Sequence, residues 1–317
     1  MNNGIKKKIR VGIIAGGWSA EREVSLKSGY AVYKALDKDK YEVILWDIKE
    51  DLDVIVKKRS EVDVIFPLLH GKRGEDGAIQ GFLNTLGVAF VGSDILASAI
   101  SMNKKISKQL FQANGLDVAK GIYIEKEDIL NQHAIDELKF PVVVKPVSEG
   151  SSFGISICYK KEELEQALKE AFKYDNEALI EEYIEGKEIT APVIGYKKID
   201  VLPLVEIVPK KGHKFFDFEA KYKSGETDEI CPARISCEQE KKVKEVAKRA
   251  FNAIGCKIWA RVDMILKEDK VYVLEVNTIP GMTENSLFPL SAKKAGMRFS
   301  ELLDKLISLS ISAYGER

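Results

Sequence analysis

The sequence predicts an α/β protein that begins with an open parallel sheet and continues into further units of sheet and helix. Over residues 1–100, short apolar runs that suit buried strands alternate with helical segments, which is typical of a parallel sheet. A chain of 317 residues is long enough for two or three domains with sizeable cores. Near the C-terminal end, Trp259–Leu266 and Val271–Asn277 fit two strands joined by a charged hairpin loop.

The N-terminal region is expected to hold the parallel sheet. Val11–Ala15 fits the first strand, Gly16-Gly17 a turn, and Ser19 the N-cap of a helix that runs to about Leu36. Another helix is predicted over Ala78–Leu86, and further strands over Tyr41–Trp46, Val62–Leu68 and Val88–Phe90.

A helix over Ile95–Ala113 leads into a middle region that is predicted to be a helix packed on a sheet. Its elements are a helix over Lys161–Lys173 and strands over Pro141–Pro146, Ile155–Tyr159 and Ala178–Tyr183. The last region is expected to contain, in order, strands Ile189–Ile194 and Leu202–Val208, an irregular loop Phe215–Cys231, helix Glu238–Gly255, the hairpin and two closing helices. The chain has no long linker, so we expect these regions to pack together with clefts between them.

The composition excludes several classes of function. Lys plus Arg and Asp plus Glu are equal at 49 each, with a pI near 6.9, so nothing favours a nucleic-acid partner. No apolar run approaches ~18 residues, and the basic start Lys6–Arg10 runs into a strand and not into a signal peptide, so no membrane association is expected. The 4 cysteines form no C-x-x-C pair, and we expect a cytoplasmic protein.

The hairpin carries the first candidate site. Side chains alternate across a strand, so Arg261 shares a face with Asp263, and Glu275 with Asn277. If Asp263 lies opposite Glu275, the oxygen ligands that Mg²⁺ needs beside substrate phosphates converge next to a guanidinium group. That register requires a three-residue loop, Glu268–Lys270, or a bulge that restores the same parity. The alternative is a solvated sheet face of mixed charge.

A second candidate site combines a lysine with a small-residue loop. Lys145 ends a run of valines, and Glu149–Gly154 can wrap phosphate oxygens with its N–H and hydroxyl groups. The sequence is not a Walker A loop, although lysine beside such a loop suits a nucleoside triphosphate. A second lysine, Lys104 in the segment Ser101–Lys105, could join this site, although it could equally be a solvated charge on a helix.

The stretch between the middle and last regions offers a place for a nucleoside. The backbone around Tyr183 and Ile184 could hydrogen-bond an adenine edge, and a carboxylate such as Glu188 could take ribose hydroxyls. An acidic linker that begins at Glu181 explains this segment equally well.

The loops after the first and third strands predict a ligand crevice. In an open α/β sheet the C-terminal ends of the strands meet at one edge, which brings Glu21 near the loop His70–Gly77. The protein has only 3 histidines, and His70 is therefore a candidate ligand contact, with a structural histidine at a turn as the alternative.

Taken together, these motifs resemble the D-alanine–D-alanine ligases, a family of the ATP-grasp superfamily, over essentially the whole chain. The motifs that carry the resemblance, in order, are Ala20–Ser25, His70–Gly77, Glu149–Ser152, Glu219–Tyr222, Arg261–Asp263 and Glu275–Thr283.

The resemblance implies a three-domain ATP-grasp fold with an N-terminal open parallel sheet domain. The expected domains are an N-terminal substrate-binding domain over residues 1–100, a central ATP-grasp domain over 101–184 and a C-terminal catalytic domain over 185–317. We also expect a homodimer. The implied activity is ATP-dependent ligation of two D-alanines through an acyl phosphate, for peptidoglycan precursor synthesis.

The resemblance also implies roles for individual residues. Lys104 and Lys145 would contact phosphates, Glu181, Tyr183 and Ile184 would hold adenine, and Glu188 would take the ribose. Two Mg²⁺ ions, with Mn²⁺ as a substitute, would be bound by Asp263, Glu275 and Asn277. Glu21, Ser151 and Tyr222 would form a hydrogen-bonded set around the first D-alanine, with His70 near its carboxylate. Arg261 and the N–H of Gly281 would stabilise an oxyanion, and Ser286 and Leu287 would contact the second D-alanine.

Three positions depart from the family pattern: Asn103 where Asp is common, Ala260 where Gly is frequent, and Ala191-Pro192, which interrupts the strand after Glu188.

The alternative functions are a D-alanyl-D-lactate or D-alanyl-D-serine ligase, another ATP-grasp carboxylate–amine ligase, and a non-catalytic nucleotide-binding protein. Tyr222 favours the dipeptide, because ligases that form D-alanyl-D-lactate tend to lack it. A dinucleotide site at Gly12–Gly17 is disfavoured by the spacing of its glycines.

Overall fold

The computed structural model describes residues 7–127, 137–210 and 227–315, whose strands form three sheets. The first sheet has three parallel strands in the order β2 (Tyr41–Asp47), β1 (Ile9–Ala15) and β3 (Val64–Pro67). β1 lies at its centre and is buried from Val11 onwards, as expected of a parallel strand that is covered on both faces. The helices of this part are α1 (Arg22–Ala35), α2 (Ile48–Lys58) and α3 (Ala78–Thr85). The predicted open parallel sheet is confirmed.

The second sheet has four antiparallel strands, in the order β4 (Gly121–Glu125), β7 (Glu177–Glu182), β5 (Val142–Pro146) and β6 (Ser156–Cys158). A short 3-10 turn, Lys161–Glu163, leads into α7 (Leu164–Ala171). The buried side chains of α7 recur three and four residues apart, which gives the helix one apolar face toward the sheet.

The third sheet has six strands and carries the hairpin. Its order is β11 (Thr227–Ile230), β10 (Val205–Pro209), β8 (Lys187–Gly195), β12 (Ile258–Lys267) and β13 (Lys270–Asn277), with β9 (Ile199–Val201) also paired to β8. α9 (Cys237–Ile254) packs on this sheet. It begins with a capping box between Ser236 and Gln239 and ends at Gly255, whose φ of 80° suits glycine.

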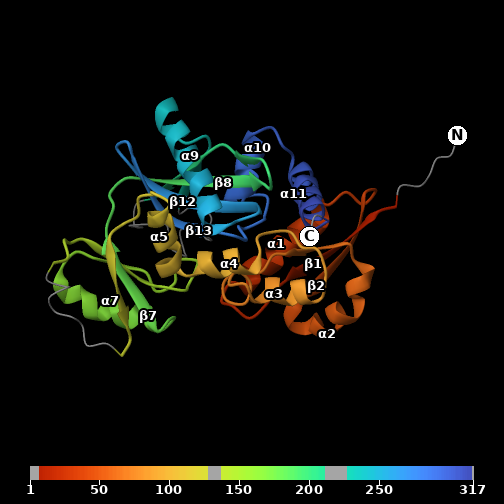
Figure 1. Cartoon of the computed structure of the whole chain (residues 1–317), viewed down its shortest axis with the longest axis horizontal. Coiled ribbons are helices and arrows are strands. Elements are labelled where there is room, and N and C mark those ends of the chain that lie inside the picture. Colours follow the sequence, from red (N-terminus) through yellow and green to blue (C-terminus); the bar gives the residue numbers. More distant parts are fainter. Residues whose placement is uncertain (1–6, 128–136, 211–226, 316–317) are drawn as a thin grey trace.

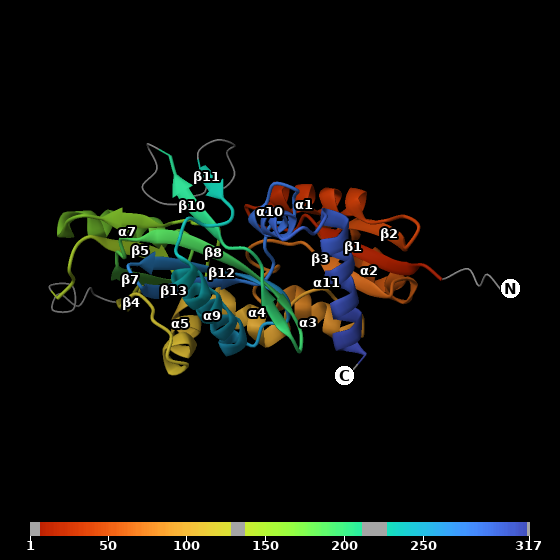
Figure 2. The ribbon, with the colours of Figure 1, turned by 90° about the horizontal axis from the view of Figure 1, so that it is seen from above.

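The three sheets lie side by side along the molecule. The first sheet is at one end, β7 and α7 are at the other, and β8, β12 and β13 lie between them (Figures 1 and 2). After α10 (Leu287–Lys294), the last helix α11 (Phe299–Tyr314) returns to the first sheet. Its Leu302 and Leu306 belong to one buried cluster with Val11, Phe66 and Trp259, so the two ends of the chain share a core. Among the described residues, no helix is long and apolar enough to cross a bilayer.

One predicted helix is interrupted. Residues 95–113 form two helices, α4 (Ile95–Met102) and α5 (Lys104–Ala113), instead of one. Asn103 has an extended ψ of 103°, and its Oδ1 accepts a hydrogen bond from the Ile106 N–H at 3.0 Å. Asn103 therefore caps α5, which places Lys104 in its first turn.

Other predicted elements are corrected. Val88–Phe90 does not form a strand, because only Phe90 makes a bridge, to Ile65. α1 begins at Arg22 and not directly after Ser19, whose Oγ accepts from the Glu21 N–H at 3.2 Å and donates to the His70 carbonyl at 2.7 Å. Part of the predicted loop 215–231 is strand β11, which pairs with β10, and residues 211–226 lie outside the described residues. The sequence interpretation did not include α2, β4 or β9.

Pro192 does not interrupt its strand. β8 continues through it, with Pro192 opposite Arg261 of β12. The Pro192 carbonyl accepts a hydrogen bond from Leu202 N at 2.9 Å, on the side of β8 away from β12. The nitrogen of a strand residue faces the same side as its carbonyl, so the missing N–H removes no hydrogen bond to β12.

Candidate active site

A cavity of about 810 Å³ lies between strands of the third sheet and loops that follow strands of the other two sheets. Its walls include the loops after β1 and β3, the start of α5, the Gly/Ser loop after β5, and parts of β11, β12 and β13. Most of the predicted site residues line it: Glu21, His70, Lys104, Ser151, Arg261, Glu275, Asn277, Gly281, Ser286 and Leu287.

Glu21 and Ser151 join the first sheet to the Gly/Ser loop. Glu21 is 4% exposed, and its Oε1 accepts a hydrogen bond from Ser151 Oγ. The φ of Ser151 is 50°, a left-handed conformation that disfavours a side chain, and such strain is often stored at functional sites. Gly71, with a φ of 71°, leaves room for the carboxylate, since a Cβ there would lie 3.1 Å from Glu21 Oε2. The predicted proximity of Glu21 to the His70 loop and to Ser151 is confirmed.

His70 is a buried, neutral imidazole at the cavity wall. Burial lowers its pKa, and the charge of Arg261 lowers it further, against the effects of Glu21 and the Ile279 carbonyl. Its Nε2 is buried and has no hydrogen-bond partner among the residues that the structure describes. A ligand that enters the cavity can supply that partner.

Glu75 was not among the predicted site residues, although it belongs to the His70–Gly77 motif. It is 8% exposed and lines the cavity, where its Oε2 accepts a hydrogen bond from the Gly71 N–H at 2.7 Å. Burial and the negative charge of Glu21 raise the pKa of Glu75 to about 8, although Gly71 and Arg261 oppose this. Glu75 is therefore largely protonated at neutral pH.

The hairpin has the predicted Asp263–Glu275 pairing through a bulge and not through the three-residue loop, because Lys267 is opposite Lys270. Asp263 is opposite Glu275 and Arg261 is opposite Asn277, with a bulge between the pairs at Asp263 and Met264. The Arg261 guanidinium holds Asp263 in a two-point contact, Nε to Oδ1 at 2.9 Å and Nη2 to Oδ2 at 2.7 Å. Asp263 also accepts a hydrogen bond from Thr190 Oγ1 on the neighbouring strand β8.

The oxygen atoms on this face could hold a magnesium ion only together with other ligands. Within the described residues no three His, Cys, Asp or Glu side chains form a metal-binding group, and the hairpin itself contributes two carboxylates and the Asn277 amide oxygen. Mg²⁺ commonly takes one or two carboxylates and fills its other positions with phosphate oxygens and water. Glu275 also lies 3.7 Å from Lys104 Nζ, so a cation is already attracted to this carboxylate.

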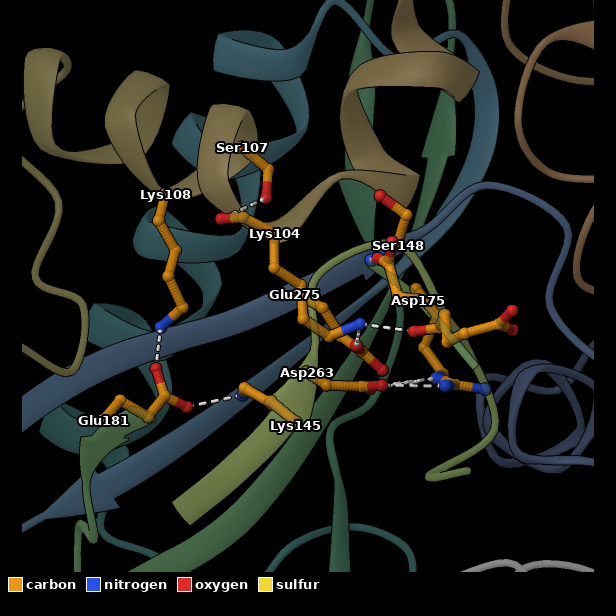
Figure 3. A network of polar contacts seen from close by, with 11 residues as sticks. Lys104, Ser107, Lys108, Lys145, Ser148, Asp175, Glu181, Asp263 and Glu275 are labelled. Atoms are coloured by element: carbon orange, nitrogen blue, oxygen red, sulfur yellow. Dashed lines mark hydrogen bonds and ion pairs between the residues drawn. The ribbon is translucent and has the colours of Figure 1, made fainter. Parts of the chain in front are cut away.

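Two buried lysines lie on the side of α5 and β5. Lys104 donates a hydrogen bond from Nζ to the Glu149 carbonyl and from its backbone N–H to the Val147 carbonyl at 2.9 Å. Lys145 is 7% exposed, and its Nζ lies 2.5 Å from Glu181 (Figure 3). Lys104 thus ties the start of α5 to the Gly/Ser loop, while Lys145 is held by the second sheet.

The loop after β13 completes the cavity. Ser286 precedes α10, and its Oγ lies 2.7 Å from Thr283 Oγ1 and accepts from the Thr283 N–H at 3.1 Å. A Cβ at Gly281 would lie 3.1 Å from Ser286 Oγ, so glycine keeps this approach open.

Family profiles match this chain along most of its length. The family described as D-ala D-ala ligase C-terminus matches residues 110–308, and the one described as D-ala D-ala ligase N-terminus matches residues 10–59 and 51–93. The chain belongs to the D-alanine–D-alanine ligase family. The resemblance predicted from the sequence is confirmed.

Relatives of the D-alanine–D-alanine ligase family are similar over nearly their whole length. The ligase of Syntrophobacter fumaroxidans is 46% identical over 306 residues, which cover 96% of this chain and 98% of the relative. A D-alanine–D-alanine ligase structure from Bacillus anthracis complexed with ATP has a TM-score of 0.86 at 38% identity, covering 97% of this chain and 99% of that one. The VanG D-Ala:D-Ser ligase of Enterococcus faecalis has a TM-score of 0.82 at 33% identity, covering 96% and 100%. The predicted ATP-grasp fold class with an N-terminal parallel sheet agrees with these ligase structures.

Some predicted residues do not line the cavity. Lys145, Glu181 and Asp263 are held in buried ion pairs, Tyr183 and Ile184 lie in the connection from β7 to β8, and Glu188 lies at the start of β8. Tyr222 lies outside the described residues.

Other charged residues besides Glu75 were not among the predicted site residues. Glu149 lines the cavity and pairs with Lys72 at 2.5 Å, and its place just before Gly150 was the available signal. Glu229 of β11 also lines the cavity, and burial raises its pKa against the effect of Arg261. Lys108 is 2% exposed and contacts Glu181, and its spacing of four residues from Lys104 was its only signal.

Proposed function

We propose that this protein uses ATP to join two D-alanine molecules into D-alanyl-D-alanine for peptidoglycan precursor synthesis, through an acyl phosphate of the first D-alanine. One observation supports the proposal: the Glu21–Ser151 pair lines the same cavity as Arg261, Glu275 and Asn277, in a chain of this ligase family. The proposed amino-acid site at Glu21 and Ser151 would thus adjoin the hairpin face that is proposed to bind phosphate and metal.

ATP would bind between the second and third sheets. Lys104 and Lys145 would neutralise its phosphates, which is the main task in phosphoryl transfer. The proposed adenine site is Glu181, Tyr183 and Ile184, at the connection between the two sheets, with Glu188 at the ribose. The ribose role of Glu188 is supported by its position at the start of β8, opposite Ile265 of β12, because β8 directly follows the connection that would hold adenine.

Asp263, Glu275 and Asn277 would hold two Mg²⁺ ions, or Mn²⁺ in their place. When bound, the ions would neutralise the charge that develops on the transferred phosphoryl group. The protein itself contributes the alignment of these three side chains, because the hairpin register holds them on one face.

The first D-alanine would bind through its ammonium group to Glu21. Ser151 would hold that carboxylate in place, and Tyr222 would complete the hydrogen-bonded set. The neutral His70, whose buried Nε2 lacks a partner among the described residues, would contact the substrate carboxylate. Orientation of this carboxylate toward the γ-phosphate then allows the acyl phosphate to form.

The second D-alanine would attack the acyl phosphate from the side of Ser286 and Leu287. Its amine forms the C–N bond, phosphate leaves, and the proton of the amine must pass to a neighbouring group. Arg261 and the N–H of Gly281 would stabilise the oxyanion of the tetrahedral intermediate. Exclusion of water from the cavity would limit hydrolysis of the acyl phosphate.

The wider organisation follows from the same proposal. We propose a substrate-binding domain over residues 1–100, a central ATP-grasp domain over 101–184 and a catalytic domain over 185–317, each containing one of the three sheets. A cytoplasmic homodimer with small-molecule substrates only, and no nucleic-acid or membrane partner, completes the proposal.

The test is release of ADP and phosphate from ATP with and without D-alanine, with mass spectrometry of the product. D-Alanine should stimulate release and yield the dipeptide, and ATP hydrolysis that does not respond to D-alanine would contradict the proposal. The similarity to a D-Ala:D-Ser ligase makes D-serine the second candidate for the attacking amine, so it belongs in the same assay, together with D-lactate.

Tyr222→Phe tests the choice between an amine and a hydroxy acid. The variant should lose dipeptide synthesis and gain relative use of D-lactate, whose hydroxyl carries no ammonium proton. Competition between D-alanine and D-lactate over pH ~6–9 measures this, since the amine titrates in and above that window. An unchanged product ratio would remove Tyr222 from the specificity determinants.

A further inference from the structure

Glu181 of β7 is paired with two buried lysines at once. Its Oε1 lies 2.5 Å from Lys145 Nζ, and its Oε2 lies 2.6 Å from Lys108 Nζ (Figure 3). We call Glu181, Lys108 and Lys145 the trio, and their side chains are between 3% and 8% exposed. The proposed nucleotide site uses Glu181 and Lys145, whereas Lys108 has no role in it.

The trio is assembled from two strands and a helix. Val143 is opposite Glu181 and Lys145 is opposite Leu179, so Lys145 and Glu181 are diagonal neighbours on one face of the second sheet. Lys108 comes from α5, one helical turn after Lys104, and the two lysines therefore project from the same side of that helix. Lys104 extends toward Glu275, while Lys108 extends toward Glu181 (Figure 3).

Charge holds the Lys108 contact. Lys108 Nζ lies 2.6 Å from Glu181 Oε2, and neither atom has another hydrogen-bond partner among the described residues. Burial lowers the pKa of Lys108, and Lys145 and Lys104 lower it further, against the attraction of Glu181. Burial alone would raise the pKa of Glu181, but Lys145 and Lys108 hold it below the ordinary value, so this carboxylate is ionised.

Two cations around one anion leave a surplus positive charge. With Lys145 as its only partner, Glu181 would be left as an unpaired buried carboxylate whenever Lys145 turned toward a phosphate. Breaking a buried pair in this way is strongly unfavourable. With Lys108 present, the carboxylate keeps a partner after Lys145 has moved.

We infer that Lys108 is a positioning residue for ATP: it keeps Glu181 paired and thereby allows Lys145 to bind a phosphate. The inference rests on the nucleotide roles proposed above for Lys145 and Glu181. Lys108 acts through Glu181 and does not itself contact the substrate.

The first test is Lys108→Met, which removes the charge and keeps the length of the side chain. The KM for ATP should rise about tenfold or more while the KM for D-alanine stays unchanged, because the loss is confined to nucleotide binding. Lys108→Arg should recover most of the loss. Lys105→Met is the matched control, since Lys105 is the same residue type on the same helix but pairs with Glu177 near the surface, and it should behave as wild type. Equal effects on both substrates, or none, would overturn the inference.

The second test asks whether Lys108 acts through Glu181. In a Glu181→Gln background there is no carboxylate charge to balance, so Lys108→Met should change the KM for ATP by less than about twofold. A tenfold change in that background would overturn the inference. The double variant contains no buried unpaired carboxylate, so this comparison remains available if Lys108→Met alone fails to fold.

Lys145→Met separates the inference from the proposed site. If it raises the KM for ATP and Lys108→Met does not, only the role of Lys108 is wrong. If Lys145→Met leaves the KM for ATP unchanged, the proposed phosphate role of Lys145 is wrong, and the inference that rests on it is wrong as well.

Discussion

Asp263 of β12 lies directly opposite Glu275 of β13, and a bulge at Leu274 makes this pairing compatible with the core. Met264 pairs with Val273, so Leu274 is the extra residue on β13. Without it, strict alternation would put Glu275 on the same face as Val273. The bulge reverses the parity, so Val271, Val273 and Val276 all enter one core cluster while Glu275 faces away from it.

This pairing predicts how the hairpin responds to Mg²⁺. Glu275→Gln removes one charge from the proposed metal face, and the Mg²⁺ concentration for half-maximal activity should rise about tenfold or more because Mg²⁺ prefers carboxylate oxygens. Titration of activity with Mg²⁺ at saturating ATP measures this. Glu268→Gln, at the exposed turn of the same hairpin, is the control and should match wild type. Full turnover by Glu275→Gln at ordinary Mg²⁺ would show that this carboxylate is not a ligand.

Arg261 is expected to act in the transition state. Arg261→Ala should lower kcat by ~100-fold or more, since loss of one oxyanion donor has an effect of this size. The variant should be less stable, because Asp263 loses its ion pair, but it should remain folded with the hydrogen bond from Thr190 in place. Arg261→Lys, which retains a charge but not the two-point geometry, should be intermediate. A variant altered in KM alone would identify Arg261 as an ordinary binding residue.

Ser151 is expected to hold Glu21 for the first D-alanine. Ser151→Ala removes the hydrogen bond to the Glu21 carboxylate, and a bond to a charged group contributes roughly 1.5–3 kcal/mol. The KM for the first D-alanine should therefore rise by about tenfold or more. The KM for ATP, measured on the same preparation, serves as the internal control. If both constants rose together, a general disturbance of the Gly/Ser loop would be the better explanation.

The raised pKa of Glu75 predicts a pH-dependent stability of the ligand-free protein. With a pKa of about 8 in the folded state against an ordinary value of 4.5, the folded protein retains a proton that the unfolded chain has lost. The free energy of unfolding should therefore fall as pH rises from 4.5 to 8, and the contribution of this group is greatest at and below pH 4.5.

Glu75→Gln keeps the shape and cannot ionise, so the variant should become more stable relative to wild type across that window, by on the order of 1–3 kcal/mol near pH 8. Urea unfolding between pH 5 and 8.5 measures the difference. Glu245→Gln, on the exposed face of α9, should follow wild type at every pH. A constant difference between Glu75→Gln and wild type would mean that Glu75 does not titrate in this range.

Much of the architecture and of the site follows from local pattern. Alternation along β12 and β13 predicts that Arg261 shares a face with Asp263 and Glu275 with Asn277. Pairing of Asp263 with Glu275 then requires either a three-residue loop or a bulge, and the structure has the bulge. The spacing of the apolar residues also indicates the bulge, because Val271 and Val273 follow strict alternation whereas Val276 is displaced from it by one residue. The C-terminal ends of parallel strands likewise brought Glu21 to the His70 loop. These features depend on residues close in sequence, or on an edge that strand direction defines.

Contacts between distant segments depended on packing in three dimensions. The pairing of Lys108 with Glu181, the shared core of α11 and β1, and the proton on Glu75 have no local signature in the chain. Each depends on which charges or apolar side chains are enclosed together once water is excluded. Desolvation and Coulomb attraction act through space, and residues 73 positions apart along the chain can therefore determine each other's ionisation, as Lys108 and Glu181 do.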